Sequence, residues 1–426
     1  MIRVVSFFAA LAVIGSTFAS ASSARPVDIP AVLTTYADLA RATYEDSLGA
    51  ARRLRKSVDV FLAKPNATTL AAAKKAWIAA RVPYQQSEAF RFGNKIVDAW
   101  EKKIARWPLD EGFIDYVDGD YGSEADDNPH YTANVIANKT IKIAGRTVDT
   151  SKITKELLST TLHGAGGVQT NVATGYHVIE FLLWGQDLNG TGPGAGNRRH
   201  TDYDLQACTN GNCDRRAQYL RVVTELLVDD LQWMVDQWGA EGAARKALVT
   251  SIGKTGLIAV FTGLGSLSYG ELAGERMKLD VLLADPEEEL DNFADTTHLS
   301  HFHTALGIEN VYLGRYRRTD GSVVSGPSVS DLVKAKSEAT DSAVKRALAL
   351  TMKRVTELKE RGESVERYDQ MIDEYNFDGK DVIDDVVEAL VAQTRAFERA
   401  IAALELRKIK FKGSDALDNP RKVFDQ

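Results

Sequence analysis

The sequence has few cysteines, few prolines and no basic block, and each shortage narrows the class of protein. The 426 residues include two cysteines and ten prolines. Lysine and arginine number 52 against 59 aspartates and glutamates, so the formal net charge is −7. An acidic chain without a basic cluster offers little to a phosphate backbone, which argues against nucleic acid as a partner. Scarce proline and 44% hydrophobic residues favour a helical globular protein.

Long apolar runs are also missing, apart from one near the N-terminus. Residues 4–18 are apolar, small or hydroxyl-bearing, follow Arg3, and precede a small-x-small cleavage pattern at residues 19–21. The run is shorter than the roughly 20 residues of a membrane helix, so we interpret residues 1–21 as a signal peptide rather than a retained anchor. No later segment approaches a membrane span. We therefore predict an exported, periplasmic protein without a transmembrane segment in the mature chain, with the outer membrane as a candidate place of association.

The two cysteines, Cys208 and Cys213, enclose a four-residue loop. In an oxidising compartment such a pair favours a disulfide. A metal-binding pair is the alternative, but neither a second cysteine pair nor a nearby histidine pair completes a zinc site.

Two common hydrolase motifs are absent. The sequence contains no His-Glu-x-x-His, and Phe181 stands where a His-x-x-Glu-His motif would need its second histidine. A Gly-x-Ser-x-Gly nucleophile turn is also missing. The absence of these motifs means that the sequence supports neither a standard zinc peptidase nor a serine hydrolase.

Most of the chain has helical periodicity. We expect helices at residues 28–63, 68–92, 151–163, 173–185, 214–238, 241–261, 267–284, 287–313, 330–360 and 379–406. Alternation around Ala144-Gly145 predicts a small β-hairpin near residues 140–149. Glycines in residues 189–204 predict a long loop and a domain boundary. We therefore predict an all-α protein of two helical-bundle lobes, residues 27–205 and 206–412, with a site at their interface.

A polar stripe follows one face of the second predicted helix. Trp77, Arg81, Tyr84, Glu88 and Arg91 recur at steps of four, three, four and three, which places them on one helix face. Charges alone would indicate a solvated surface. Trp and Tyr favour positions where the ring is buried and the polar tip has a partner, so a functional or interdomain face is the competing interpretation.

A second polar stripe lies in a strongly apolar segment. His177, Glu180, Trp184 and Asp187 recur at steps of three, four and three. A buried carboxylate is costly unless it is paired or binds a metal. Helical bundles build metal sites from a Glu and a His three residues apart. A His–Glu hydrogen bond inside a core is the alternative.

Later segments contain further candidate ligands. Glu271 and Glu275 lie one helical turn apart among small residues. Asp295 and His298 share a helix face in the same way. Either pair could complete a site that begins with His177.

The chain resembles the imelysin family of exported bacterial proteins, which are also described as insulin-cleaving metalloproteinase-like or iron-regulated protein A-like. The resemblance rests on five segments in the family's order: 80–92, 107–111, 174–187, 270–277 and 305–314. It implies a two-lobed, all-helical fold with a site between the lobes.

The resemblance also implies site residues. The family's Gly-x-His-x-x-Glu motif maps onto Gly175, His177 and Glu180, and the glutamate of its Tyr-x-x-x-Glu segment maps onto Glu88. We predict His177, Glu180 and Glu88 as metal ligands. The further candidate ligands are Glu275, Asp295 and His298. The residues expected to contact the ligand or support the site are Arg81, Tyr84, Arg91, Trp184, Asp187 and Glu271.

Three functions stay open at this point. Mixed carboxylate and imidazole ligands suit iron, with zinc as the other candidate, so we predict a metal-binding protein of iron uptake with a membrane or outer-membrane partner. The family's older name implies a metallopeptidase, which needs a metal-activated water and a general base that the sequence does not single out. An adaptor whose groove is lined by Trp77, Tyr84 and Trp184 is the third.

Overall fold

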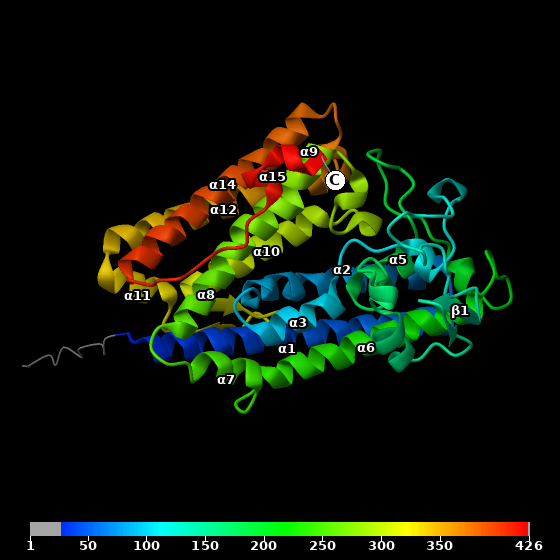
Figure 1. Cartoon of the computed structure of the whole chain (residues 1–426), viewed down its shortest axis with the longest axis horizontal. Helices are drawn as coiled ribbons and strands as arrows, with labels where there is room; N and C mark the ends of the chain where they lie inside the picture. Colours follow the sequence, from blue (N-terminus) through cyan, green and yellow to red (C-terminus); the bar gives the residue numbers. More distant parts are fainter. Residues whose placement is uncertain (1–26, 425–426) are drawn as a thin grey trace, which may run out of the picture.

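Helices make up nearly all the regular structure of residues 27–424, the part of the chain that the computed structural model describes. The predicted signal peptide at residues 1–21 lies outside the described residues. Two small antiparallel hairpins are the strands found in the described chain. The predicted all-α fold is confirmed, and Figure 1 shows two helical layers lying against each other.

The first bundle is built around one long helix, α1. Asp28 caps this helix, because its side chain accepts a hydrogen bond from the backbone N–H of Ala31. Helix α2 folds back along α1 after a capping box at Asn66, and α6 packs along another side of α1. The bundle comprises α1 (Ile29–Ala63), α2 (Ala67–Ser87), α3 (Lys95–Ile104), α5 (Tyr176–Trp184), α6 (Cys213–Gln237) and α7 (Ala243–Val249).

The second bundle is built from the C-terminal half of the chain. Its main contacts run between α12 and α14 and between α14 and the π-helical segment η6. Its elements are α8 (Thr255–Ser266), η6 (Leu267–Lys278), α9 (Leu279–Leu283), α11 (Val329–Lys336), α12 (Glu338–Ser364), α13 (Tyr368–Ile372) and α14 (Phe377–Ala403), with the short α15 (Asp415–Asp418) at its end.

Helix α10 (Thr297–Leu313) joins the two bundles, because it packs against α2 on one side and α12 on the other. The buried apolar residues form two clusters, a large one centred on the first bundle and a smaller one inside the second. Since α6 follows residue 205 and yet packs on α1, the first bundle takes helices from both sides of the expected boundary.

Several predicted element bounds differ from the structure. The helix expected at 287–313 begins only at Thr297, because residues 286–295 form short turns that carry acidic side chains inward. The helix expected at 330–360 breaks at Ser337, whose hydroxyl caps α12. The β-hairpin predicted near 140–149 is confirmed as β1 (Thr140–Ile143) and β2 (Arg146–Asp149). A second hairpin, β3 (Arg315–Arg317) and β4 (Val323–Ser325), was not predicted.

The disulfide Cys208–Cys213 is present, as predicted. It closes the loop immediately before α6 and leaves no free cysteine in the described chain.

One continuous helical stretch among residues 27–424, Thr255–Leu283, is long and apolar enough to span a membrane. In its most apolar window, 72% of the residues are buried inside the protein. Burial of this kind is what the core helix of a helical bundle requires.

Candidate metal centre

The helix that carries the second polar stripe, α5, is buried along its whole length. It begins at Gly175, whose φ of +95° is unfavourable for other residues. A Cβ at this position would lie 2.2 Å from the carbonyl oxygen of Ile104, so a side chain cannot fit. Glycine therefore lets α5 pack closely on the end of α3, which places His177 and Glu180 in the interior.

Three side chains meet at the centre of this region. The Nδ1 atom of His177 lies 2.9 Å from Oε2 of Glu180 and 4.0 Å from Oδ1 of Asp291. Within residues 27–424, His177, Glu180 and Asp291 form the one group of three His, Cys, Asp or Glu side chains whose ligand atoms all lie within 4.8 Å of one another. We call these three residues the His177 group.

Neighbouring groups hold the two carboxylates in place. The backbone N–H of Ala294 donates to Oε1 of Glu180 at 3.0 Å. The Nη2 atom of Arg81 donates to Oδ1 of Asp291 at 2.6 Å, and the hydroxyl of Ser300 donates to Oδ2 of the same residue. Asp291 is therefore shared between the His177 group and an ion pair that crosses from α2 to the segment before α10.

The electrostatics of the group favour neutral forms. Burial, followed by the charges of Arg81 and Arg276, lowers the pKa of His177 well below its usual value. Burial, followed by the charge of Asp291, raises the pKa of Glu180 well above its usual value. Since neutral imidazole is the form that binds metal, His177 is prepared to be a ligand, and its Nδ1 atom faces both carboxylates of the group.

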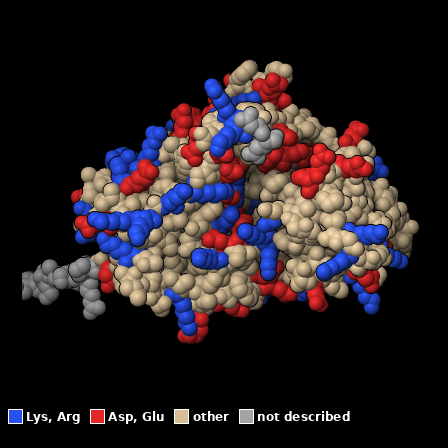
Figure 2. Space-filling model, viewed as in Figure 1, with Lys and Arg blue, Asp and Glu red and all other residues tan. Residues whose placement is uncertain are grey.

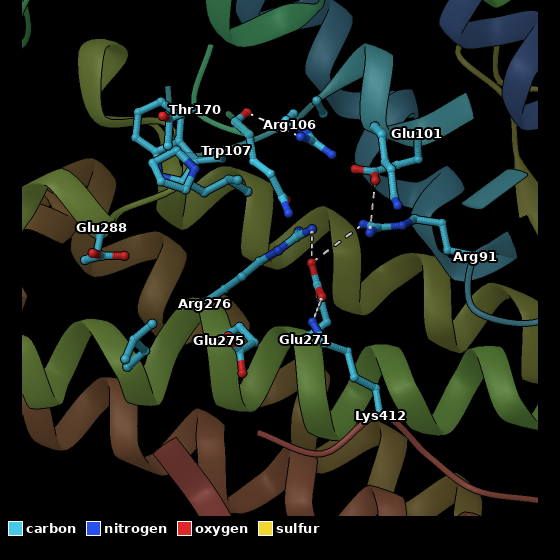
Figure 3. A pocket seen from close by; sticks show the side chains of 16 residues that line it. Arg91, Glu101, Arg106, Trp107, Thr170, Glu271, Glu275, Arg276, Glu288 and Lys412 are labelled. Carbon is cyan, nitrogen blue, oxygen red and sulfur yellow. Dashed lines mark hydrogen bonds and ion pairs between the residues drawn. The ribbon is translucent and has the colours of Figure 1, made fainter. Parts of the chain in front are cut away.

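A cavity of about 430 Å³ lies between the bundles, next to the His177 group. Trp107 stands between the two, because it lines the cavity and its ring centroid lies 5.0 Å from that of His177. Figure 3 shows Trp107 at one end of the cavity, Arg91 and Glu101 at the other, and Arg276 and Glu271 between them. In the space-filling view this face of the molecule is hollowed between the bundles, with side chains of both charges at the rim (Figure 2).

Glu88 lies outside the His177 group. Its Oε2 atom lies 2.7 Å from Nη1 of Arg276 and 3.7 Å from Nη1 of Arg91. Glu271 also pairs with Arg276, at 2.9 Å, and with Lys412, at 2.7 Å. These acidic residues thus balance the arginines of the cavity wall and do not meet His177.

The remaining predicted ligands are dispersed. Glu275 lines the cavity. Asp295 is buried close enough to Glu180 for its charge to contribute to the raised Glu180 pKa. His298 is buried in α10, where its Nε2 atom lies 3.5 Å from Nη1 of Arg367.

The predicted supporting residues make different contacts, and of these only Arg91 and Glu271 are among the residues that line the cavity. Arg81 pairs with Asp291, and Arg91 pairs with Glu101 at 3.1 Å. The ring of Tyr84 packs on Tyr176 at 4.8 Å, and that of Trp184 packs on Trp77 at 5.3 Å. Asp187 accepts a hydrogen bond from the backbone N–H of Asn189.

The sequence did not identify Asp291. It lies in the segment that was expected to be helical, and an acidic residue between Leu290 and Asn292 carries no specific spacing signal. Asp291 belongs to an acidic run that starts at Glu287, and runs of this kind are typical of a solvated surface. Asp291 joins the His177 group because the turn at residues 286–295 folds back against α5.

The His177 group passes a simple test of fit to a metal ion. It offers one neutral imidazole and two carboxylates, which together suit iron or zinc. The positive charge of Arg81 offsets the negative charge of Asp291, with which it forms an ion pair. The site therefore carries less net negative charge than its two carboxylates alone would give. Without a cation, the buried Glu180 carboxyl keeps a proton, as its raised pKa indicates. A bound cation would neutralise the carboxylate in place of that proton.

Comparisons with known proteins agree on one family. Two solved structures have the same fold, each covering 90% of this chain. One, from Parabacteroides distasonis, is described as an iron-regulated protein A precursor, with 20% identity, a TM-score of 0.61 and 97% of its own chain covered. The other is an imelysin-like protein from Psychrobacter arcticum, with 14% identity, a TM-score of 0.57 and 99% of its chain covered.

A search of curated proteins finds no match. The sequence model of the Imelysin family matches residues 40–397, which is most of the chain and includes both bundles and the His177 group. The protein therefore belongs to the imelysin family.

Proposed function

We propose that the protein is an exported metal-binding protein of iron uptake, and that His177, Glu180 and Asp291 hold the ion. The observation that carries this proposal is the His177 group itself, in which a neutral imidazole and two carboxylates converge in the interior. An interior arrangement of this kind is costly unless a cation or a proton compensates the carboxylates.

Burial favours metal binding over peptide hydrolysis. The three side chains of the His177 group are at most 1% exposed, and Trp107 separates them from the cavity. A metallopeptidase must bring an extended peptide, an activated water and a general base to the metal. A small ion needs far less access than a peptide.

The choice of iron rests on ligand chemistry and on a relative. Carboxylate and imidazole donors without thiolates suit iron, and zinc accepts the same set. One solved structure with this fold is described as an iron-regulated protein A precursor, a description that belongs to that protein and supports iron as the first ion to test.

The proposed periplasmic location rests on two features. Residues 1–21 have the pattern of a signal peptide. The disulfide Cys208–Cys213 suits an oxidising compartment such as the periplasm. We propose that a membrane or outer-membrane protein of the uptake system exchanges iron with it.

A metal titration tests the proposal. Chelator-treated protein is titrated by calorimetry with ferrous, ferric and zinc ions, in parallel with His177→Ala and Glu180→Gln. We expect the wild type to bind one iron ion at the His177 group and each variant to lose about 100-fold or more in affinity, because each removes a ligand. The control is His200→Ala, which removes a histidine remote from the group.

Two results would overturn the proposal. One is unchanged iron affinity in both variants. The other is chelator-sensitive cleavage of an unfolded peptide that His177→Ala and Glu180→Gln abolish, which would favour the metallopeptidase. Tighter binding of zinc than of iron would reassign the ion.

A further inference from the structure

A cavity of about 490 Å³ lies at the start of α2, in the first bundle. Its walls are the first turns of α2 and the segment at residues 197–209, which precedes α6. It shares no lining residue with the cavity between the bundles. Four of its lining side chains are basic or imidazole: Lys74, Arg198, Arg199 and His200. We call it the Lys74 pocket.

The lining of the Lys74 pocket is positive, although the protein as a whole has a net charge of −7. No aspartate or glutamate of residues 27–424 lines it. Arg198 is balanced by Asp115, whose Oδ2 atom lies 2.8 Å from Nη1 of the arginine. Lys74 and Arg199, in contrast, form no ion pair within the described chain. The pocket therefore holds two positive charges that no acid balances.

Lys74 is held in place beside Arg198. Its ammonium group lies 5.0 Å from the centre of the Trp184 ring. The backbone N–H of Arg198 donates to the carbonyl oxygen of Trp184 at 2.6 Å, so both basic residues lie against the same tryptophan. Burial, followed by the charge of Arg198, lowers the pKa of Lys74 to about 8. The fold thus keeps two like charges together, an arrangement that an anion would stabilise.

The pocket also offers hydrogen-bond donors that lack partners. The Arg198 side chain is 1% exposed, and its Nε atom has no hydrogen-bond partner within the described chain. Ala67, the first residue of α2, lines the pocket, and the N–H groups of a first helical turn have no partner inside the helix. The capping side chain of Asn66 accepts from the N–H groups of Thr68 and Thr69, not from that of Ala67.

These features define the class of ligand. A metal cation would be repelled by Lys74 and Arg199, and an apolar ligand would leave the buried Nε donor of Arg198 unsatisfied. A carboxylate carries a single charge, whereas a phosphate group carries about 1.5 to 2 negative charges near neutral pH. Phosphate oxygens accept from lysine, arginine and the N–H groups at the start of a helix. The pocket is larger than a bare phosphate ion, so it has room for the organic part of a phosphate ester.

We propose that the Lys74 pocket binds a phosphate group, as the free ion or as the ester of a small molecule, between Lys74, Arg199 and the start of α2. The site is independent of the proposed metal centre, because the Lys74 pocket contains no member of the His177 group.

Calorimetric titration of metal-free protein, dialysed free of chelator, tests the proposal. The probes are inorganic phosphate and glycerol 3-phosphate, with acetate as an anion of single charge. We expect one phosphate group to bind per protein and acetate to bind at least about 10-fold more weakly. Lys74→Met with Arg199→Gln should lower the affinity for phosphate by about 100-fold, because each substitution removes a charge-assisted contact worth about 10-fold. Tighter binding of glycerol 3-phosphate would identify an ester as the ligand, and tighter binding of inorganic phosphate would identify the free ion.

A matched double variant controls for the change in net charge. Lys75→Met with Arg221→Gln removes the same two kinds of side chain from exposed positions that do not line the pocket, and it should keep the full affinity. His177→Ala should keep it too, so failure of the iron proposal and failure of this one are distinguishable.

Chemical labelling gives a second measurement that needs no variant. Acetic anhydride acylates neutral amines, and the lowered pKa of Lys74 makes more of this amine neutral near pH 8. Phosphate at ten times its Kd should reduce the labelling of Lys74 by about 10-fold, because most of the protein then carries the ligand. The labelling of exposed Lys75, the next residue of α2, should not change.

Three results would overturn the proposal. The first is the absence of both a binding heat and protection of Lys74 with either phosphate probe. The second is an equal loss of affinity in the two double variants, which would show general attraction to surface charge. The third is acetate binding as tight as that of phosphate. If Lys74→Met with Arg199→Gln does not fold, Lys74→Gln alone is the substitute and should lose about 10-fold in affinity.

Discussion

The charges of buried side chains in the site region are compensated in two ways. Arg81 is 3% exposed, yet its guanidinium pairs directly with Asp291 and lies over the rings of Trp77, Tyr84 and Tyr176. The carboxylates of Glu180 and Glu289 form no ion pair with a lysine or arginine of residues 27–424, and burial raises the pKa of each. A buried carboxylate is therefore compensated by an ion pair at Asp291 and by a proton or a bound cation at Glu180.

Replacing Arg81 should have opposite effects on stability and on metal binding. Arg81→Met leaves Asp291 buried without its cation, so we expect the free energy of unfolding of metal-free protein to fall by about 3–5 kcal/mol. Iron affinity should rise, because the ion no longer competes with the guanidinium for Oδ1 of Asp291. Urea unfolding and iron titration measure the two changes. Arg41→Met, which breaks an exposed pair with Glu45, should cost less than about 1 kcal/mol. Weaker iron binding by Arg81→Met would show that the arginine supports the ion.

The raised pKa of Glu111 predicts that the stability of the protein depends on pH. Burial raises its pKa from 4.5 to about 7, so the folded state holds a proton that the unfolded state releases between these values. Stability is therefore highest below the unfolded pKa and falls as pH rises towards about 7. We expect Glu111→Gln to reduce this loss between about pH 4.5 and pH 7 by about 2–3 kcal/mol. Urea unfolding at both pH values measures it, and exposed Glu124→Gln is the control. An unchanged pH profile would contradict the prediction.

At the scale of elements, the helix Thr255–Leu283 shows how packing overrides local signals. The sequence predicts separate helices at residues 241–261 and 267–284. The structure runs α8, η6 and α9 together without a break. Glycines in this helix admit the C-terminal segment: a Cβ at Gly265 would lie 2.1 Å from the Phe411 ring, and one at Gly270 would lie 2.4 Å from the carbonyl oxygen of Lys412.

A pair of glycine substitutions tests this explanation. A Cβ at Gly270 would lie 2.4 Å from the carbonyl oxygen of Lys412, so Gly270→Ala should lower the free energy of unfolding by about 1–3 kcal/mol. Gly49→Ala in α1 meets only an ordinary contact at 3.6 Å, so it should add up to about 1 kcal/mol through helix propensity. Urea unfolding measures both. Limited trypsin digestion should cut the segment after Lys408 or Lys410 faster in Gly270→Ala alone. Equal stability of the two variants would contradict the explanation.

At the scale of the whole molecule, the two bundles are joined through buried polar contacts as well as through α10. Arg81 pairs with Asp291, and Glu88 pairs with Arg276, each linking α2 or its end to the second half of the chain. Buried pairs of this type are lost together when the bundles separate, which leaves unpaired charges on both faces. The two bundles are therefore expected to unfold together in one cooperative step.

We therefore expect a single thermal transition. Scanning calorimetry of the disulfide-intact protein should give one peak with equal calorimetric and van't Hoff enthalpies. The double substitution Glu88→Gln with Arg276→Met removes one cross-bundle pair and should broaden or split the peak. Lys155→Met, which breaks an exposed pair within the first bundle, should leave it single. Two well-separated transitions in the wild type would show that the bundles unfold independently.

The sequence by itself determined the helical class, the first hairpin, the disulfide, the family and the neighbourhood of His177 and Glu180. These follow from local information: periodicity, turn residues, cysteine spacing and short motifs act within a few residues of each other. The place of Asp291 in the His177 group, the separation of Glu88 from that group and the packing of α6 on α1 were decided by the tertiary structure alone. Each depends on residues about 110 to 200 positions apart in the chain, and the sequence does not record which side chains at that separation meet. Only the folded chain decides whether a buried carboxylate meets an arginine, a histidine or another carboxylate, and that choice sets its chemistry.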